Sequence, residues 1–316
     1  MINRVFNTRQ LPWILLGVLV SVGSGSIAPA YAQAGRAGLS FLKLGTSARG
    51  IAMGDAMAAS VQGPASVSYN PAGLVTDDTS SAAELLFTHR EWIEETRIEF
   101  LAGSAHLSDN QVIGLAITST TVPDIQLRTR PGEPEGTFTA RNFAAVGSYA
   151  RAFTEELAIG IALKFLYEKI LIDEASGFAV DLGARIATPI EHLNVGASLA
   201  NLGSMSSLRN EATTLPALFR LGPAYSFDLS NERAVVLTAV DLLYLFAEKR
   251  TYLNWGGEVE FDRTVAVRGG YQFGSEGRGL TAGMGLRYGI VRLDYAYAKL
   301  SQDLGNTHSF TLGLTL

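Results

Sequence analysis

The chain of 316 residues contains no cysteine and little charge. Without cysteine, no disulfide bond can hold the fold together. Charged residues make up 17% of the chain, whereas a typical soluble domain has about 25%. The formal net charge of −5 and the lack of a lysine and arginine cluster argue against nucleic acid as a partner. Its four histidines have no metal-ligand spacing and no serine nucleophile motif occurs, so we predict no metal, no cofactor and no enzymatic activity.

Long apolar runs are also missing, except near the start of the chain. Two arginines precede the apolar stretch 11–22, and Ala30-Tyr31-Ala32 has the small residues that signal peptidase requires. A membrane anchor would need about 20 uninterrupted apolar residues, and Gly23 ends the run too early. The pattern therefore predicts a secretory signal peptide over residues 1–32.

The rest of the chain has many short segments in which apolar and polar residues alternate. The last of them, residues 307–316, puts Phe310, Leu312 and Leu314 on one face and small polar residues on the other. Successive side chains of a strand point to opposite faces, so this pattern is typical of strands between lipid and water. We find about fourteen such segments, among them 111–122, 192–201 and 278–288. Strands that cross an outer membrane need roughly 9 to 11 residues, and these segments are long enough.

The predicted fold class is therefore all-β: a transmembrane antiparallel β-barrel of about 14 strands over residues 79–316. Twelve or sixteen strands would also fit the pattern. An exported barrel of this kind predicts a location in the outer membrane of a diderm bacterium, with outer-membrane lipid as a partner.

The alternation also assigns charged side chains to the lumen. A charge facing lipid at the bilayer midplane costs about 2 to 4 kcal/mol, so charges on the non-apolar face should point inward. We expect them to form interior ion pairs that stiffen the barrel or, alternatively, a selectivity filter. The predicted lumen-facing charged residues are Lys164, Asp181, Arg185, Arg220, Glu258, Glu260, Arg268, Arg287, Arg292 and Asp294.

Residues 33–78 lack the strand pattern. From Leu39 to Ser60, small residues are interspersed with larger apolar ones, which favours short helices. Asn70 followed by Pro71 is typical of a helix start, because asparagine caps a helix and proline fits its first turn. We expect this segment to be buried inside the barrel as a plug or hatch, or against the periplasmic rim. Its candidate functional residues are Phe41, Leu42, Leu44, Arg49, Met53, Asp55, Asn70 and Pro71.

Three motifs of this segment resemble the N-terminal signature of the PorV/PorQ family of outer-membrane proteins. They are Phe41-Leu42-Lys43-Leu44-Gly45, the stretch ARGIAMGDA at 48–56 and the stretch YNPAGL at 69–74. Members of that family are fourteen-stranded barrels akin to the FadL-type long-chain fatty-acid channels. The resemblance implies a role in type IX protein secretion. There the barrel binds the C-terminal signal domains of secreted cargo proteins and passes them between secretion-system components.

Such a role would use extracellular loops, and the longest predicted loops, 123–136 and 203–215, are modest. Three functions remain open: a secretion barrel that binds cargo, a FadL-like channel for hydrophobic small molecules such as long-chain fatty acids, and a structural barrel with a permanently closed lumen. In the channel, residues 39–60 would form a gated hatch. The candidate partner-binding residues of the loops are Arg128, Arg130, Glu133, Glu135 and Arg209.

Overall fold

The computed structural model describes residues 37–76, 81–209, 211–229, 233–275, 277–301 and 304–316. The predicted signal peptide, residues 1–32, lies outside the described residues. Within the described ranges, no helix is both long and apolar enough to cross a membrane.

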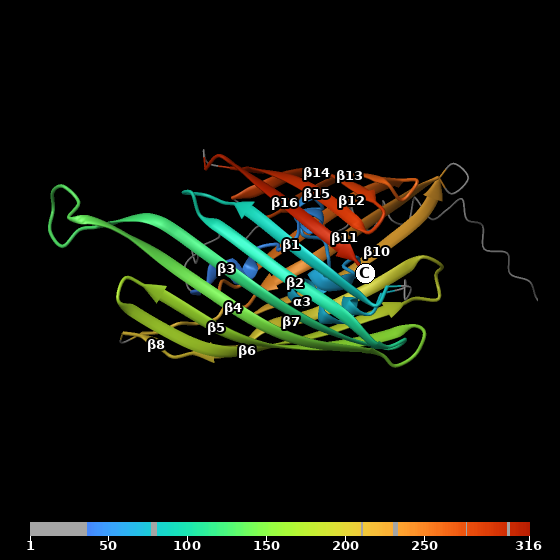
Figure 1. The fold of residues 1–316 in the computed structure, drawn as a ribbon, viewed down its shortest axis with the longest axis horizontal. Coiled ribbons are helices and arrows are strands. Elements are labelled where there is room, and N and C mark those ends of the chain that lie inside the picture. The colour runs from blue at the N-terminus through green and yellow to red at the C-terminus, as the bar shows by residue number, and fades with distance from the viewer. Residues whose placement is uncertain (1–36, 77–80, 210, 230–232, 276, 302–303) are drawn as a thin grey trace, which may run out of the picture. The chain divides into compact units, whose positions relative to one another are not determined.

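The described residues form a closed barrel of fourteen antiparallel strands, as the sequence predicts (Figure 1). Neighbours in the sequence are neighbours in the barrel, and β1 pairs with β16 to close it. A small hairpin of two strands with two residues each, β8 (Ser207–Leu208) and β9 (Glu211–Ala212), lies in the connection between β7 and β10. The barrel strands are β1 (Ala83–Glu91), β2 (Arg97–Ser108), β3 (Gln111–Leu127), β4 (Gly136–Ala152), β5 (Leu157–Ile170), β6 (Asp173–Ala187), β7 (Leu193–Met205), β10 (Leu218–Leu229), β11 (Ala234–Leu245), β12 (Arg250–Phe261), β13 (Val265–Phe273), β14 (Arg278–Tyr288), β15 (Val291–Leu300) and β16 (Asn306–Thr315).

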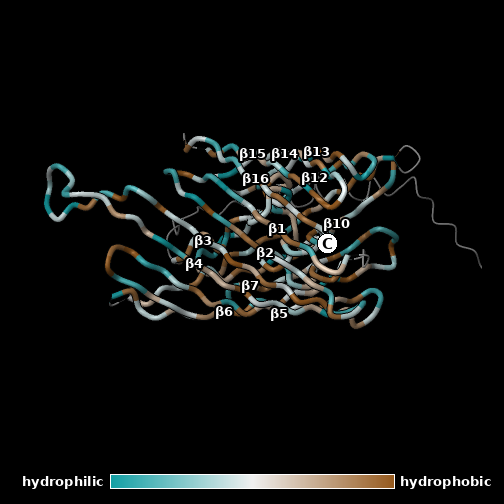
Figure 2. The backbone as a smooth tube through the Cα atoms, viewed as in Figure 1, coloured by the Kyte–Doolittle hydropathy of each residue, from teal (hydrophilic) through white to brown (hydrophobic). Residues whose placement is uncertain are grey.

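The outer surface of the barrel is apolar. Leu115, Leu163 and Phe178 are 68%, 62% and 70% exposed although they lie in the middle of strands. Figure 2 shows hydrophobic and hydrophilic residues interspersed along the strands, as alternation between two faces requires. A closed barrel satisfies its backbone hydrogen bonds internally, and its apolar exterior suits lipid. The protein is therefore an outer-membrane β-barrel.

The two ends of the barrel differ in their connections. β1 begins and β16 ends at the same end, where connections such as 109–110 and 289–290 are short. The longer connections, 128–135 and 206–217, lie at the opposite end, which is therefore the extracellular one. The β3–β4 hairpin projects past the neighbouring strands there (Figure 1).

The predicted boundaries of the two long loops are wrong. β3 continues through Pro123 to Leu127, and its register with β4 shifts between Val122 and Ile125. Asp124 within this irregularity has a φ of 53°, in the left-handed region. Such a bulge accommodates a proline that cannot donate to a regular ladder, so Pro123 does not end the strand. β7 likewise runs to Met205, so the second loop also begins later than predicted.

Residues 37–76, called the plug below, lie inside the barrel rather than at its rim (Figure 1, blue). Because they are packed from all sides, nearly all of their apolar residues are buried. The short helices of the plug are η3 (Ser40–Lys43), α2 (Ala48–Ala52), η4 (Gly63–Ala65), α3 (Ser66–Tyr69) and η5 (Pro71–Leu74). The Asn70 side chain accepts a hydrogen bond from the backbone N–H of Ala72, and Pro71 occupies the first turn of η5.

The substitution Leu163→Arg should lower the free energy of unfolding by about 2 to 4 kcal/mol, because it places a charge on the lipid side in the middle of β5. The same change at Leu229, at the end of β10, should cost at most about 1 kcal/mol because that charge reaches the interface. Urea titrations in phospholipid vesicles, read by heat-modifiable gel mobility, measure both. Equal costs at the two positions would contradict the assigned lipid-facing surface.

Candidate functional site

The plug backbone comes directly against the barrel wall at several places because the wall residues there are glycines. A Cβ atom added at any of these positions would lie under 3.0 Å from a plug atom. Glycine weakens a strand and is used where another backbone approaches closely. The seven strands that carry such a glycine surround the plug on several sides. The glycines are Gly114, Gly160, Gly183, Gly196, Gly256, Gly270 and Gly283.

Polar side chains of the wall bind the plug backbone. The Ser198 hydroxyl and Nη1 of Arg220 both donate to the carbonyl oxygen of Tyr69, each at 2.9 Å. The carboxylate of Asp241 accepts from the backbone N–H of Ala58 at 2.7 Å. Short helices leave many N–H and C=O groups without intrahelical partners, and buried groups of this kind need partners elsewhere. The polar lumen provides them.

Asn70, one of the predicted plug residues, connects three parts of the structure. Its side-chain amide donates to the carbonyl of Ala58 at 2.7 Å and to the carbonyl of Ala184 on β6 at 3.0 Å. Its amide oxygen caps η5. Asn70 is fully buried, and its hydrogen bonds connect two parts of the plug with each other and with β6 of the wall.

A network of ion pairs joins the plug to β12, β13 and β15. Arg49 of α2 contacts Glu258 at 2.8 Å, and Arg268 also binds Glu258. Arg268 then contacts Asp294 at 2.7 Å, and Arg292 contacts the same carboxylate at 2.8 Å. Four of the predicted lumen charges and the predicted plug residue Arg49 thus meet in one cluster. Its members are paired with one another, which is the arrangement that makes buried charges tolerable.

The remaining predicted lumen charges are distributed around the plug. Lys164 binds Asp181 at 2.6 Å and also donates to the amide oxygen of Asn201 at 2.7 Å. Arg185 donates to the carbonyl of Val75 at 2.9 Å. Arg220 binds the plug backbone at Tyr69, as described above.

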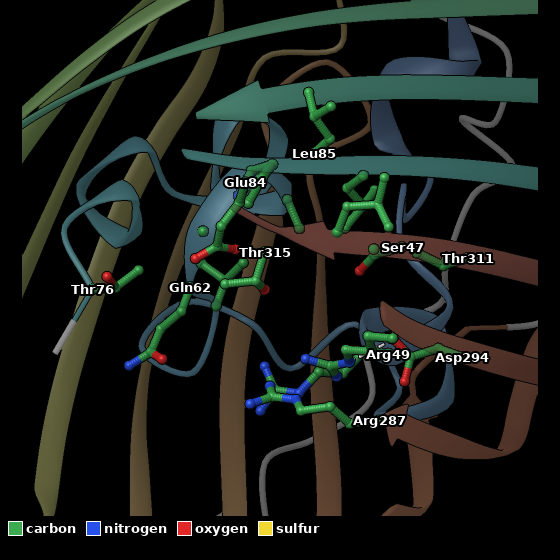
Figure 3. A pocket seen from close by; sticks show the side chains of 18 of the residues that line it. Ser47, Arg49, Gln62, Thr76, Glu84, Leu85, Arg287, Asp294, Thr311 and Thr315 are labelled. Carbon is green, nitrogen blue, oxygen red and sulfur yellow. Dashed lines mark ion pairs between the residues drawn. The ribbon is translucent and has the colours of Figure 1, made fainter. Parts of the chain in front are cut away.

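A polar cavity of about 270 Å³ lies between the plug and strands β1, β12, β14, β15 and β16 (Figure 3). It is near the periplasmic end, since Glu84 and Thr315 line it. Figure 3 shows Glu84 and Thr315 on one side of the cavity and the guanidinium groups of Arg49 and Arg287 on another. Glu260, the last of the predicted lumen charges, also lines it. Carboxylates and guanidinium groups make this cavity suitable for water rather than for an apolar molecule.

An apolar pocket lies on the other side of the plug, toward the extracellular end. The predicted plug residues Phe41, Leu42 and Leu44 form its roof, and Phe100 and Val146 contribute from the wall. Val67 and Ala144 add further apolar surface, and Thr46, Ser68, Thr118 and Lys164 are the polar residues of the lining. The volume is only about 30 Å³. Such a pocket would have to widen before it could hold an organic molecule, since ligand pockets are usually about 300 to 1,000 Å³.

The structure covers this pocket with an apolar cluster. Leu39 and Phe41 of the plug are buried with Met205 of β7 and Leu215 of the loop before β10. The backbone N–H of Gly38 donates to the carbonyl of Thr214 in the same loop at 3.0 Å. The extracellular loop and the start of the plug therefore form one lid.

Three of the candidate partner-binding arginines already have partners within the protein: Arg128 and Arg130 in their own hairpin, and Arg209 on β6. Arg128 donates to Gln126 at 2.7 Å, and Arg130 lies 3.8 Å from Glu135. Arg209 contacts Asp173 at 2.5 Å. Glu133 is exposed at the tip of the β3–β4 hairpin.

Several residues of the lumen escaped the sequence analysis. Asp55 was predicted, but its partners were not: Arg278 contacts its carboxylate at 2.7 Å and the Tyr69 hydroxyl donates to it at 2.9 Å. Arg90 is fully enclosed and was not singled out. Arg278 begins its strand and Arg90 lies in a polar stretch, so alternation alone does not distinguish them. The recurrence of glycine on the inward face of the strands was the available signal that another part of the backbone packs against the wall.

Comparison with known proteins identifies solved structures that share the fold of this chain. No family model matches the chain, and no curated protein matches it. Among solved structures, the Pseudomonas putida toluene transporter TodX aligns with 85% of this chain and 96% of its own, with a TM-score of 0.59 and 14% identity. The deltaS2S3 mutant of TodX, described as a monoaromatic hydrocarbon channel, gives 85% and 97% coverage, TM-score 0.59 and 14% identity.

The deltaS2 mutant of the same channel aligns with 85% of this chain and 97% of its own, with a TM-score of 0.56 and 13% identity. Identities this low show a shared fold. The chain therefore has a FadL-like outer-membrane barrel fold, and its substrate or partner is a matter for proposal.

The substitution Gly256→Val should loosen the plug, because the new side chain would meet the backbone of Met53. Overpacking of this kind costs about 1 to 3 kcal/mol, so hydrogen exchange of the α2 amides should accelerate about tenfold or more. Gly147→Val is the matched control, since its Cβ would meet only one atom, at 3.9 Å. Unchanged exchange in Gly256→Val would mean that the glycine contacts do not hold the plug.

The substitution Glu258→Gln should destabilise the barrel by about 3 to 5 kcal/mol, because it leaves Arg49 and Arg268 buried with one carboxylate fewer. Glu260→Gln is the control in the same strand and cavity; no ion pair of Glu260 occurs within the described residues, so it should cost less than about 1 kcal/mol. Urea unfolding in detergent micelles compares the two. Similar costs would show that the ion pairs of Glu258 add no stability.

Proposed function

We propose that this protein is a FadL-like outer-membrane channel for hydrophobic small molecules, and that the plug is its gate. The observation that carries the proposal is the apolar pocket under Phe41, Leu42 and Leu44, on the extracellular side of the plug. A solute of low water solubility gains free energy by leaving water for such a pocket, at about 25 cal/mol per Å² of apolar surface. The shared fold with a toluene transporter supports the same reading.

The charge at the pocket is already neutralised. Lys164 is the cation among its lining residues, and Asp181 lies 2.6 Å from its ammonium group. Asn201 takes a further hydrogen bond from Lys164. An entering solute therefore meets apolar side chains, a few uncharged hydroxyl groups and a compensated ion pair. This lining favours uncharged or largely apolar molecules, and a long-chain fatty acid would bind it through its hydrocarbon chain.

The pocket must open for this function, because it is now small. The lid over it consists of Leu39, Phe41 and the loop before β10. Movement of η3 away from β4 and β5 would enlarge the pocket without disturbing the barrel ladder. The glycine contacts and ion pairs of α2 lie elsewhere in the lumen, so the deeper part of the plug can remain seated at this stage.

The second candidate is the binding of secreted cargo proteins in type IX secretion, together with secretion-system components. The β3–β4 hairpin favours it, because it projects past the barrel at the extracellular end and carries Glu133 at an exposed position (Figure 1). Purification of a tagged chain from gently solubilised membranes of its native host tests this function. Co-purified proteins with a shared C-terminal domain would support it, and a barrel without protein partners would count against it.

The substitution Thr118→Trp should reduce uptake of toluene and of oleate about tenfold or more. Thr118 points into the apolar pocket and is 7% exposed, so an indole there fills the space that a solute needs. Ile117→Trp is the matched control. Ile117 precedes Thr118 on the same strand, but it is 45% exposed on the lipid side, where an aromatic ring is tolerated.

Uptake of the labelled compounds is measured in cells that lack their own hydrophobic channel and produce each variant to the same level in the outer membrane. Uptake by the parent no greater than by cells without the protein would reject the channel. Equal loss in both variants would show that the pocket is not on the route.

A further inference from the structure

A second group of charges lies between the plug and the extracellular ends of β1 and β14. It comprises Arg90, Trp92, Arg278, Asp55 and Tyr69, here called the Arg90 cluster. The guanidinium carbon of Arg90 lies 4.2 Å from the centre of the Trp92 ring, and that of Arg278 lies 5.1 Å from it. Two like charges thus share one aromatic ring, which follows the extracellular end of β1.

Arg90 has fewer acceptors than its charge requires. It is 1% exposed, and its Nη1 donates to the carbonyl of Gly45 at 3.1 Å. Its Nε and Nη2, and Nη2 of Arg278, find no acceptor among the residues that the structure describes. Buried polar groups are nearly always hydrogen-bonded, and an unpaired buried charge is costly. An acceptor for these three donor nitrogens is therefore to be expected.

The described residues of the cluster carry one negative charge against two positive ones. Asp55 contacts Arg278 at 2.7 Å and accepts from the Tyr69 hydroxyl at 2.9 Å. Burial, reinforced by the nearby Asp55, raises the pKa of Tyr69, so its phenol stays protonated and adds no second negative charge. The missing acceptor should therefore be an anion.

Both arginines line one small cavity. Arg90, Arg278, Gln272 and Thr281 line it together with Asp55, and its volume is about 10 Å³. This is about the space that one water-sized particle needs. Phosphate, sulfate and the carboxylate of a fatty acid are larger than that, whereas a halide requires only a slight movement of the side chains.

We propose that a small monovalent anion of the size of chloride binds between Arg90 and Arg278 and helps to hold the plug against the barrel wall. The anion accepts from the unpaired guanidinium nitrogens and offsets the excess positive charge. It thereby links β1 and β14 through the Arg90 cluster to Asp55 and Gly45 of the plug. This site goes beyond the proposed channel function and does not depend on it.

Trp92 can report on the site, because bromide quenches tryptophan fluorescence by direct contact. After residue 32 the chain has two tryptophans, Trp92 and the lipid-facing Trp255. In a Trp255→Phe background, the folded barrel in detergent is titrated with sodium bromide against sodium gluconate at constant ionic strength. The expected result is quenching that saturates at millimolar bromide and is reversed by chloride. Quenching that rises linearly without saturation overturns the proposal.

Arg90→Met removes one half of the site, and Arg97→Met is its control. Arg97 is an exposed arginine whose Cα pairs with that of Glu91, next to Trp92, outside the cavity. The saturable quenching should disappear in Arg90→Met and persist in Arg97→Met; its persistence in both overturns the proposal. If Arg90→Met does not fold, anomalous diffraction from bromide-soaked crystals of the parent protein tests the site instead. An anomalous peak between Arg90 and Arg278 supports the site, and its absence overturns it.

Discussion

The structure depends on one constraint: an irregular backbone is enclosed in a closed barrel and must find all its hydrogen-bond partners there. The helices of the plug span three to five residues, so most of their N–H and C=O groups have no intrahelical partner. Ser198, Arg220 and Asp241 provide such partners from the wall. The polar character of the lumen follows from this need as much as from exclusion of charge from lipid.

The same constraint explains why the inward face of the barrel carries glycines at some positions and long charged side chains at others. Where the plug backbone touches the wall, as at Gly256, no side chain fits. Where it stands further off, long side chains such as Arg49 and Arg268 bridge the space, and they must pair because they are buried. Inward apolar residues occur where the plug itself is apolar: Leu237 packs against the cluster of Met53 and Met57 although it shares a face with Asp241.

Much of the fold could be predicted because lipid imposes a simple pattern. The predicted segment 278–288 coincides with β14, and the two-faced alternation identified the barrel as a whole. The errors lie at the extracellular ends of β3 and β7, where strands continue beyond the bilayer and lipid no longer selects apolar residues. Pro123 looked like a breaker, but an irregular ladder position accommodates it.

The site was harder to predict than the fold because its partners come from distant parts of the sequence. Alternation assigns Glu258 and Asp294 to the lumen, but it does not indicate that both meet Arg268. Arg90 and Arg278 are separated by most of the barrel sequence and meet only because β1 closes the ring next to β16. Local sequence patterns therefore do not show which strands closure of the barrel brings together, although closure determines which side chains meet in the lumen.

The two ends of the plug are held by different kinds of contact, and this difference bears on gating. α2 is seated on wall glycines and tied into the Arg49 network, both of which resist displacement. η3 and the residue Gly38 before it are held by the Lys43–Glu248 pair at 2.5 Å, by hydrogen bonds from Gly38 to Thr214 and from Asn201 to Leu42, and by the apolar cluster around Phe41. Because η3 has one ion pair where α2 belongs to a network of several, and because an apolar solute can replace the apolar contacts of η3, η3 costs less to move than α2. A gate in this barrel would therefore open first at its extracellular lid, with the deeper plug still closing the lumen.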